Sequence, residues 1–580
     1  MQAQVMSGRQ RWDWAGLGWL FLFFWYFSGV THLLIQLTGT TGFASFRQAF
    51  LLSAIWLIPV LLFPARARAI AGSIGVLLWA CSLVGLGYFC IYGQQFSQSV
   101  IFIMFESNMA ESSEYFAQYF AWWMVPVYLL YTLGAWLLWK RVRPLEFSRN
   151  QALVLSLALF VALLAYPLGK QVYKHGNWPT ALEKFEARVE PAVPWQMAVA
   201  YHRYLDTLAD MQGMLHNVSK IPPLKNLKDA SADQPKTLVL VIGESTNRQR
   251  MSLYGYQRNT TPELDKLKDQ LAVFDNVVTP RPYTIEALQQ VLTFADEEHP
   301  DLYLSTPSLV SMMKQAGYKT FWITNQQTMT KRNTMLTTFS EQADEQVYLN
   351  NNRNQNARQY DGDVLEPFSK ALADSAPRKF IVVHLLGTHM SYQYRYPPSY
   401  DKFTDRQGVP AGVRDDQLPT YNSYDNAVLY NDFVVSSLIK DYAKTDPNGF
   451  LLYLSDHGED VFDSAGHNTL GRNEAKPTAP MYTIPFMAWA SPKWRETHDW
   501  NFTADLDRPY SSSHLIHTWA DLAGLNFDEL DRSKSLVSDS FKARPLLIGD
   551  PYQTEQRALI DFSLMKPKKT DAAPADVAQK

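Results

Sequence analysis

The stretch KTLVLVIGEST, residues 236–246, predicts a buried strand that ends on a carboxylate. Its run from Leu238 to Ile242 is apolar on both faces, which is typical of a strand in a sheet that helices cover on both sides. Gly243 permits a turn, and Glu244 follows it. Because a carboxylate directly after a buried strand is costly without a partner, Glu244 predicts a binding site at this strand end.

Further apolar runs alternate with helical patterns along the chain, at residues 319–326, 379–389, 449–459 and 483–490. This alternation predicts an α/β fold with a mainly parallel sheet and helices on both faces. In such sheets, ligands bind beyond the carboxyl ends of the strands. His389, Asp456 and His457 all follow predicted strands, as Glu244 does. We therefore expect these side chains to gather at one edge of the sheet.

Asp456 and His457 are neighbours in the turn SDHGE, residues 455–459. Side chains of adjacent strand residues point to opposite faces, so this pair can converge only past the strand end, where Gly458 permits a bend. Zinc accepts carboxylate and imidazole ligands. Taken alone, the triplet DHG fits a hydrogen-bonded turn equally well. The set of Glu244, Asp456 and His457 is more specific and predicts a metal site.

A nucleophile is predicted in the segment VVTPRPYTIEALQQVLTF, residues 277–294. Its apolar spacing indicates a helix whose first turn begins at Thr284. The hydroxyl then lies at the positive end of the helix dipole, where phosphate binds. A capping role for Thr284 is the alternative. Thr279 is a rival hydroxyl that lacks a helix behind it, and Ser245 lacks the second glycine of an esterase nucleophile elbow.

The first part of the chain has the composition of a membrane domain. Apolar segments long enough to cross a bilayer, which takes about 20 helical residues, lie at residues 14–36, 48–63, 69–92, 115–139 and 150–169. They predict a five-span α-helical membrane domain over residues 1–169. The first segment is too long for a cleaved signal peptide and is followed by others, so it predicts an anchor.

Basic residues set the expected orientation of these spans. One set of connections carries Arg9, Arg11, Arg66, Arg68 and the cluster at 140–149, whereas the opposite set carries only Arg47. The amino terminus is therefore expected inside. Five crossings place the rest of the chain outside, so we expect a multi-pass protein of the bacterial inner membrane with a periplasmic domain.

The net charge and the cysteine content narrow the class of protein further. The formal net charge is -3, with 53 Lys+Arg against 56 Asp+Glu, which does not favour nucleic-acid binding. The two cysteines, Cys81 and Cys90, lie in the third predicted span, so the exported part is expected to lack disulfides.

Beyond the membrane domain, three segments are expected. Residues 170–235 form a helical juxtamembrane linker, whose run at 195–215 fits an interfacial or a packing helix. Residues 236–563 form the periplasmic catalytic domain. Residues 564–580 form a disordered tail rich in Ala, Lys, Asp and Pro.

Several motifs resemble a known family. They are GESTNRQRMSLYGYQRNTTPELD, the helix at Thr284, LLGTHMSYQYRYP, SDHGED and GHN. This set is similar to the phosphoethanolamine transferases of Gram-negative bacteria, which belong to the sulfatase and alkaline-phosphatase superfamily. The resemblance covers nearly the whole chain and is closest to the type that modifies a heptose of the lipopolysaccharide core.

The resemblance implies a zinc enzyme with one or two ions. It implies that zinc is held by the side chains of Glu244, Thr284, Asp456 and His457. Thr284 would be the nucleophile. His389 and His467 would face the phosphoryl group or a second zinc ion.

The resemblance also implies the substrates. Phosphatidylethanolamine would donate phosphoethanolamine to Thr284, and the lipopolysaccharide core would accept it from the phosphoethanolamine-threonine intermediate. In the loop FESNMAESSEYF, the resemblance assigns donor contacts to Ser107, Asn108 and Glu111, whereas a solvated acidic loop is the alternative.

Other functions stay open at this point. Branches of the family that act on lipid A carry periplasmic disulfides, which this sequence lacks, and this favours the heptose type. A glycerophosphotransferase of the lipoteichoic-acid synthase kind has the same plan of five spans and a catalytic threonine. A catalytically inactive, membrane-tethered scaffold or envelope sensor is the alternative from another class.

Overall fold

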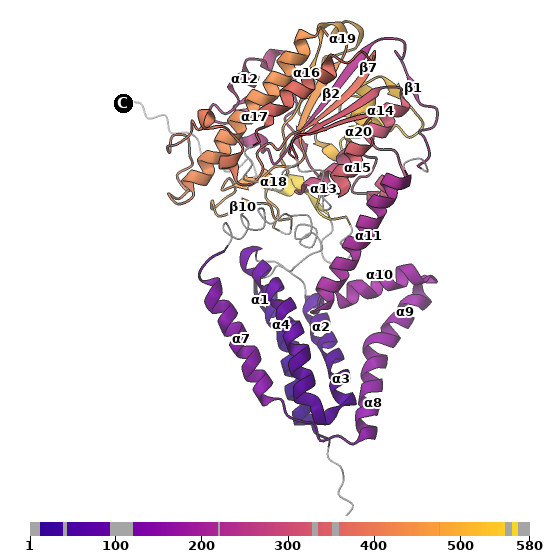
Figure 1. Ribbon diagram of the computed structural model, residues 1–580, viewed down its shortest axis with the longest axis vertical. Coiled ribbons are helices and arrows are strands. Elements are labelled where there is room, and N and C mark those ends of the chain that lie inside the picture. Colours follow the sequence, from indigo (N-terminus) through magenta and orange to yellow (C-terminus); the bar gives the residue numbers. More distant parts are fainter. Residues whose placement is uncertain are drawn as a thin grey trace, which may run out of the picture. The chain divides into compact units, whose positions relative to one another are not determined.

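The computed structural model describes residues 12–38, 43–92, 120–217, 221–326, 334–350, 359–474, 476–551 and 559–565. It forms two compact units, Met1–Leu208 and Ala209–Lys580 (Figure 1). The predicted tail lies outside the described residues, except that Leu564 and Met565 end the 3-10 helix η14 (Phe562–Met565).

The first unit consists of helices: α1 (Trp14–Thr38), α2 (Phe43–Leu52), α3 (Leu57–Leu62), α4 (Ala67–Tyr92), α7 (Met124–Arg141), α8 (Arg149–Phe160), α9 (Tyr166–His175), α10 (Trp178–Val189) and α11 (Trp195–Asn217). Aromatic side chains join α1 to α4 and α7, and Phe23, Phe27 and Tyr131 are buried between them. The Tyr131 hydroxyl donates to Ser82 Oγ at 2.8 Å, which satisfies a polar group inside an apolar core.

Among the described residues, four helical stretches are long and apolar enough to cross a membrane: Trp14–Leu37, Ser45–Leu62, Pro64–Ile91 and Arg149–His175. They coincide with four of the five predicted spans. The remaining span, predicted at 115–139, overlaps α7, an 18-residue helix that ends in Lys140 and Arg141. Those two cations, with its tyrosines and tryptophans, make α7 less apolar than the four other stretches.

The second of these stretches is not a continuous α-helix. A 3-10 turn, η1 (Ser53–Trp56), separates α2 from α3. Pro59 in α3 has no N–H for the carbonyl of Ile55, and its ring would clash with that carbonyl in a regular α-helix. The tighter turn before Pro59 follows from this constraint.

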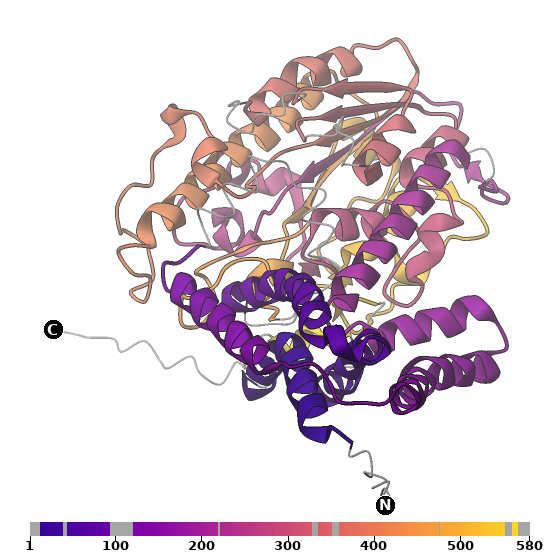
Figure 2. The same ribbon diagram turned by 60° about the horizontal axis from the view of Figure 1, so that its bottom comes forward.

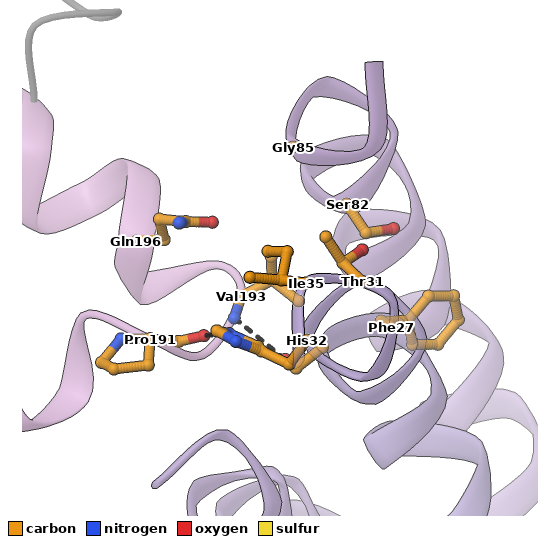
Figure 3. A pocket seen from close by; sticks show the side chains of 10 residues that line it. Phe27, Thr31, His32, Ile35, Ser82, Gly85, Pro191, Val193 and Gln196 are labelled. Carbon is orange, nitrogen blue, oxygen red and sulfur yellow. Dashed lines mark hydrogen bonds between the residues drawn. The ribbon is translucent and has the colours of Figure 1, made fainter. Parts of the chain in front are cut away.

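Two hydrogen bonds fasten α1 to the segment that leads into α11. His32 Nε2 lies 2.5 Å from the carbonyl oxygen of Pro191, and the N–H of Val193 donates to Ser28 Oγ at 3.1 Å. Figure 3 shows His32 and Pro191 facing each other beside a small pocket that Thr31 and other side chains line. The part of the predicted linker up to Leu208 thus belongs to the first unit.

The second unit is built around a seven-stranded sheet in the order β3-β11-β8-β2-β7-β5-β6. The strands are β2 (Lys236–Gly243), β3 (Leu271–Val273), β5 (Lys319–Thr324), β6 (Glu345–Tyr348), β7 (Arg378–His384), β8 (Phe450–Ser455) and β11 (Phe486–Ala490). Four of the six pairings are parallel, and the two that involve β11 are antiparallel, so the sheet is mixed. Among its described residues, the connection from β8 to β11 has one helix, the single turn α18 (Ala479–Tyr482), which is too short to serve as a crossover helix.

Helices cover both faces of this sheet (Figures 1 and 2). Leu238, Leu240 and Ile242 of β2 share one core with α13 (Thr284–Val291), α14 (Leu309–Gln315) and α20 (Leu515–Leu522). Val239 and Val241 share the opposite core with α16 (Leu365–Leu372) and α17 (Leu418–Lys444). Each such buried aliphatic side chain contributes about 1.5–3 kcal/mol. Because β2 is the central strand, its carboxyl end lies at the middle of the sheet edge.

Candidate metal centre

The carboxyl ends of β2 and β8 bring Glu244 and Asp456 together. These strands are parallel neighbours with Gly243 opposite Ser455, so the chain leaves both at the same edge. The N–H of Ser245 donates to Asp456 Oδ1 at 3.1 Å, and the N–H of Asp456 donates to the carbonyl of Gly243 at 3.1 Å. These two hydrogen bonds hold the turn after β2 against the turn after β8.

Glu244, Asp456 and His457 form the one group of metal-ligating side chains found among the described residues. One ligand atom of each lies within 4.8 Å of the others, and each side chain is at most 1% exposed. His457 Nε2 lies 3.2 Å from Glu244 Oε1 and 3.3 Å from Asp456 Oδ2. The imidazole Nδ1 lies 2.9 Å from the carbonyl of Gly458, so Nδ1 carries the proton and Nε2 keeps its lone pair toward the site.

The predicted nucleophile lies against this triad. Thr284 is the first residue of α13, and its hydroxyl donates to Glu244 Oε2 at 3.0 Å and lies 3.2 Å from His457 Nε2. Capping is not its role, since the N-cap residue is Tyr283 and no side chain caps this helix end. The rival Thr279 is buried, and its hydroxyl donates to the carbonyl of Arg281. Ser245 donates to Glu244 Oε1 at 2.7 Å and so orients that carboxylate.

The charges of the triad suit a bound cation. Burial alone raises the pKa of Glu244, but the hydrogen bond with His457 and the charge of Arg472 bring it well below its usual value. Burial and the charge of Glu244 hold the pKa of Asp456 well above its usual value. Asp456 Oδ2 is buried and accepts no hydrogen bond from the described residues. The site thus offers an Asp456 oxygen that accepts no hydrogen bond from the described residues, the carboxylate of Glu244 and the lone pair of His457 Nε2. Zinc accepts ligands of these kinds.

His389 lies in the loop that follows β7, and this loop packs on Glu244. The N–H and hydroxyl of Thr388 donate to the carbonyl of Glu244 at 2.9 and 3.1 Å. Burial lowers the pKa of His389 to about 3, against the opposing charge of Glu244, so the ring is neutral. Its Nδ1 is buried without a hydrogen-bond partner among the described residues. His389 is thus available for a ligand beside the triad.

His467, the other described residue of the predicted site, lies outside the triad. His467 has a φ of 49°, and its Nδ1 lies 2.6 Å from the carbonyl of Phe462. Its ring does not belong to the group of ligand atoms within 4.8 Å. Ser107, Asn108 and Glu111 are outside the described residues.

Two polar contacts of the triad were not predicted. Gln326 Nε2 donates to Glu244 Oε2 at 3.2 Å, and Gln326 follows the carboxyl end of β5, where the strand-end rule could have found it. Arg472 Nη1 donates to His457 Nε2 at 2.6 Å. Arg472 follows the two-residue strand β10 (Leu470–Gly471), which leaves no periodic signal in the sequence.

A sulfatase family model matches residues 236–525. Over 570 residues, the chain is 52% identical to phosphoethanolamine transferase EptC of Escherichia coli K12, covering 97% of this chain and 98% of the relative. Over the same length and with the same coverage, it is 54% identical to phosphoethanolamine transferase CptA of Salmonella typhimurium.

Solved structures resemble both units. The crystal structure of the C-terminal periplasmic domain of EptC from Escherichia coli, in complex with Zn, is 60% identical with a TM-score of 0.58; the match covers 60% of this chain and 97% of that chain. The integral membrane protein EptA from Neisseria meningitidis has a TM-score of 0.59 at 18% identity, covering 90% of this chain and 98% of that chain, which shows a shared fold. The chain therefore belongs to the sulfatase family and, within it, to the phosphoethanolamine transferases.

Proposed function

We propose that this protein transfers phosphoethanolamine from phosphatidylethanolamine to a heptose of the lipopolysaccharide core, with Thr284 as the nucleophile. The observation that carries this proposal is the position of the Thr284 hydroxyl, 3.0 Å from Glu244 and 3.2 Å from His457. A hydroxyl at the start of a helix and beside a buried metal triad has the environment of an activated nucleophile. The names of the relatives EptC and CptA support the transferred group.

In the first transfer, a bond forms between Thr284 Oγ1 and phosphorus, and the bond from phosphorus to the diacylglycerol oxygen breaks. Glu244 accepts the hydrogen bond of the threonine hydroxyl and so aims its lone pairs into the site. A zinc ion held by Glu244, Asp456 and His457, with Thr284 as a fourth ligand, supplies the positive charge that favours a deprotonated threonine oxygen.

The proton lost by Thr284 ends on the departing diacylglycerol oxygen, which keeps the charges balanced. His389 is the candidate carrier, because its ring is neutral and its Nδ1 has no partner among the described residues. His467 is the second candidate. In the second transfer, an acceptor oxygen of the lipopolysaccharide core displaces the Thr284 oxygen from phosphorus, and the proton of the acceptor group ends on Thr284 Oγ1, which restores its hydroxyl.

The proposed setting is the inner membrane. Residues 1–169 would cross it five times from an inside amino terminus, with α7 as the fourth crossing. Residues 170–235 would link this part to a periplasmic catalytic domain at 236–563. The apolar stretches of the first unit support this, as does the similarity of the second unit to the C-terminal periplasmic domain of EptC. Ser107, Asn108 and Glu111 would contact the donor headgroup.

The test uses the full chain in detergent with labelled phosphatidylethanolamine and, separately, labelled phosphatidylglycerol. Intact-protein mass spectrometry should show one phosphoethanolamine on Thr284, no adduct in Thr284→Ala and a normal adduct in Thr279→Ala. Labelling by phosphatidylglycerol would indicate a glycerophosphotransferase instead, and labelling by neither lipid would indicate an inactive scaffold. Mass spectrometry of lipopolysaccharide from cells with and without the protein would locate the acceptor.

A further inference from the structure

Arg472 reaches into the triad, and the described residues include no hydrogen bond from its guanidinium to a carboxylate. Its Nη1 lies 2.6 Å from His457 Nε2. Among the described residues, the only carboxylate within 4.0 Å of its guanidinium is Glu244, at 3.8 Å. The side chain is only 15% exposed, so water provides little compensation. Against the effect of burial, the charges of Glu459, Glu244 and Asp456 raise the pKa of Arg472, but the described residues include no hydrogen bond from its guanidinium to these carboxylates.

Other buried arginines of the second unit, unlike Arg472, bind carboxylates directly. Arg250 pairs with Asp425 at 2.7 Å and Asp463 at 2.9 Å. Arg281 binds both oxygens of Glu474, at 2.5 and 3.1 Å. These guanidinium groups are neutralised within the fold and hold it together, whereas Arg472 donates to a neutral ring nitrogen. Its remaining N–H groups are therefore available to an oxygen of a ligand.

The contact between Arg472 and His457 is incompatible with a metal ion on the triad. The lone pair of His457 Nε2 can be given to a cation or to an N–H donor, but not to both. When the triad holds its ion, the guanidinium must turn away from this nitrogen. The guanidinium can then bind an anion that enters the site.

The distances point to the phosphoryl group. Thr284 Oγ1 lies 3.2 Å and Arg472 Nη1 lies 2.6 Å from the same His457 Nε2. The hydroxyl oxygen and the guanidinium nitrogen are therefore at most 5.8 Å apart, the sum of these distances. The guanidinium gives up its contact with His457 when the ion binds, and a phosphorus bonded to Thr284 Oγ1 then offers it an oxygen to bind at about 2.8 Å instead.

We propose that Arg472 binds a non-bridging phosphate oxygen of the donor and then of the phosphoethanolamine-threonine intermediate. This inference rests on the proposed function. Arg472 neither gives nor takes a proton, and the bonds that form and break are those of the two transfers. Its guanidinium neutralises the phosphodiester and the charge that grows on its oxygens in the transition state. Arg472 is thus a catalytic residue for both transfers.

The experiment measures how fast the Thr284 adduct forms in one turnover. Full-length, zinc-loaded protein in nanodiscs is mixed with phosphatidylethanolamine, the adduct is followed by intact-protein mass spectrometry, and zinc is measured by elemental analysis. Arg472→Gln should slow adduct formation by about 100- to 1000-fold with zinc content unchanged. Arg472→Lys should be slowed less, because it keeps the charge but loses the planar fork. The control is Arg414→Gln, since this surface guanidinium pairs with Asp416 and is 55% exposed.

Two results would overturn the proposal. One is adduct formation by Arg472→Gln within threefold of the unsubstituted protein. The other is loss of zinc in step with loss of rate, because Arg472 would then only hold His457 in place. If Arg472→Gln does not fold, Arg472→Lys decides: a slowed rate with normal zinc content supports the role, and an unchanged rate removes it. Thr284→Ala separates the two hypotheses, because activity in that variant would defeat the proposed function itself.

Discussion

Gly387 lies directly against the backbone of Glu244. A β-carbon on Gly387 would come within 2.6 Å of the carbonyl oxygen of Glu244 and 2.7 Å of its nitrogen, and the glycine has a φ of +53°. Only a residue without a side chain allows the loop after β7 to approach the end of β2 this closely. The position of His389 relative to the triad therefore depends on this glycine.

Gly387→Ala is expected to impair metal binding as well as stability. The positive φ costs about 1–3 kcal/mol for an alanine, and the β-carbon must in addition displace the backbone that carries Glu244. Zinc content and the thermal unfolding temperature should both fall. Elemental analysis of purified protein, with a melting curve in detergent, measures the two effects.

Gly255→Ala is the matched control for this prediction. Gly255 has a φ of +93°, but a β-carbon there would meet no atom within 4 Å. Its alanine variant should share the backbone strain and keep its zinc. Equal zinc binding by the two variants would show that the close approach of Gly387 to Glu244 does not matter.

Asp361 should be required to hold the loop of His389. Its carboxylate accepts the N–H groups of Leu386 at 2.9 Å and Gly387 at 2.7 Å, and the amide of Asn325 at 2.8 Å. Asp361→Ala leaves the N–H groups of Leu386 and Gly387 without this acceptor, at about 1–3 kcal/mol for each buried one. We expect a lower unfolding temperature and slower formation of the Thr284 adduct.

The control is Asp363→Ala, which removes an exposed carboxylate from the same 3-10 helix, η9 (Asp361–Val364). It should leave the unfolding temperature and the adduct rate nearly unchanged. If Asp361→Ala forms the adduct as fast as Asp363→Ala does, the loop keeps its position without the carboxylate, and the prediction is wrong.

The triad could be predicted from the sequence because it follows a simple rule of parallel sheets. Glu244, Asp456 and His457 each follow a continuous apolar run, and neighbouring parallel strands end at the same edge. Thr284 could be predicted because helical periodicity begins at it. The antiparallel direction of β11 could not be predicted, because a strand that is buried on both faces has the same composition whether it runs parallel or antiparallel.

The position of Arg472 beside the triad could not be predicted from the sequence. Arg472 follows a strand of two residues, and an arginine after glycine does not by itself indicate a site. Its role depends on which carboxylates lie close, and those come from segments far apart in the chain. The antiparallel pair of β9 (Asp460–Val461) and β10, which brings Arg472 back toward His457, has too few residues to show an alternating pattern.

The second unit should lose stability in acid through His517. This residue of α20 is 6% exposed, and burial together with Lys534 lowers its pKa to about 4, against the opposing charge of Asp531. An unfolded histidine has a pKa of about 6.5, so the unfolded state binds more protons between these two values. Stability is then fully present above about pH 6.5 and falls as the pH drops toward 4, by about 3 kcal/mol at most.

His517→Gln isolates this contribution, since Gln can accept the N–H of Asp531, which now donates to His517 Nδ1 at 3.2 Å, but cannot take up a proton in this range. Chemical denaturation of the full chain in detergent at pH 7.5 and pH 5 should show a smaller difference for the variant than for the unsubstituted protein. The control His299→Gln replaces a histidine that is 61% exposed and should leave the difference unchanged. An equal loss of stability in acid for all three proteins would mean that His517 is protonated in the folded state as readily as in the unfolded one.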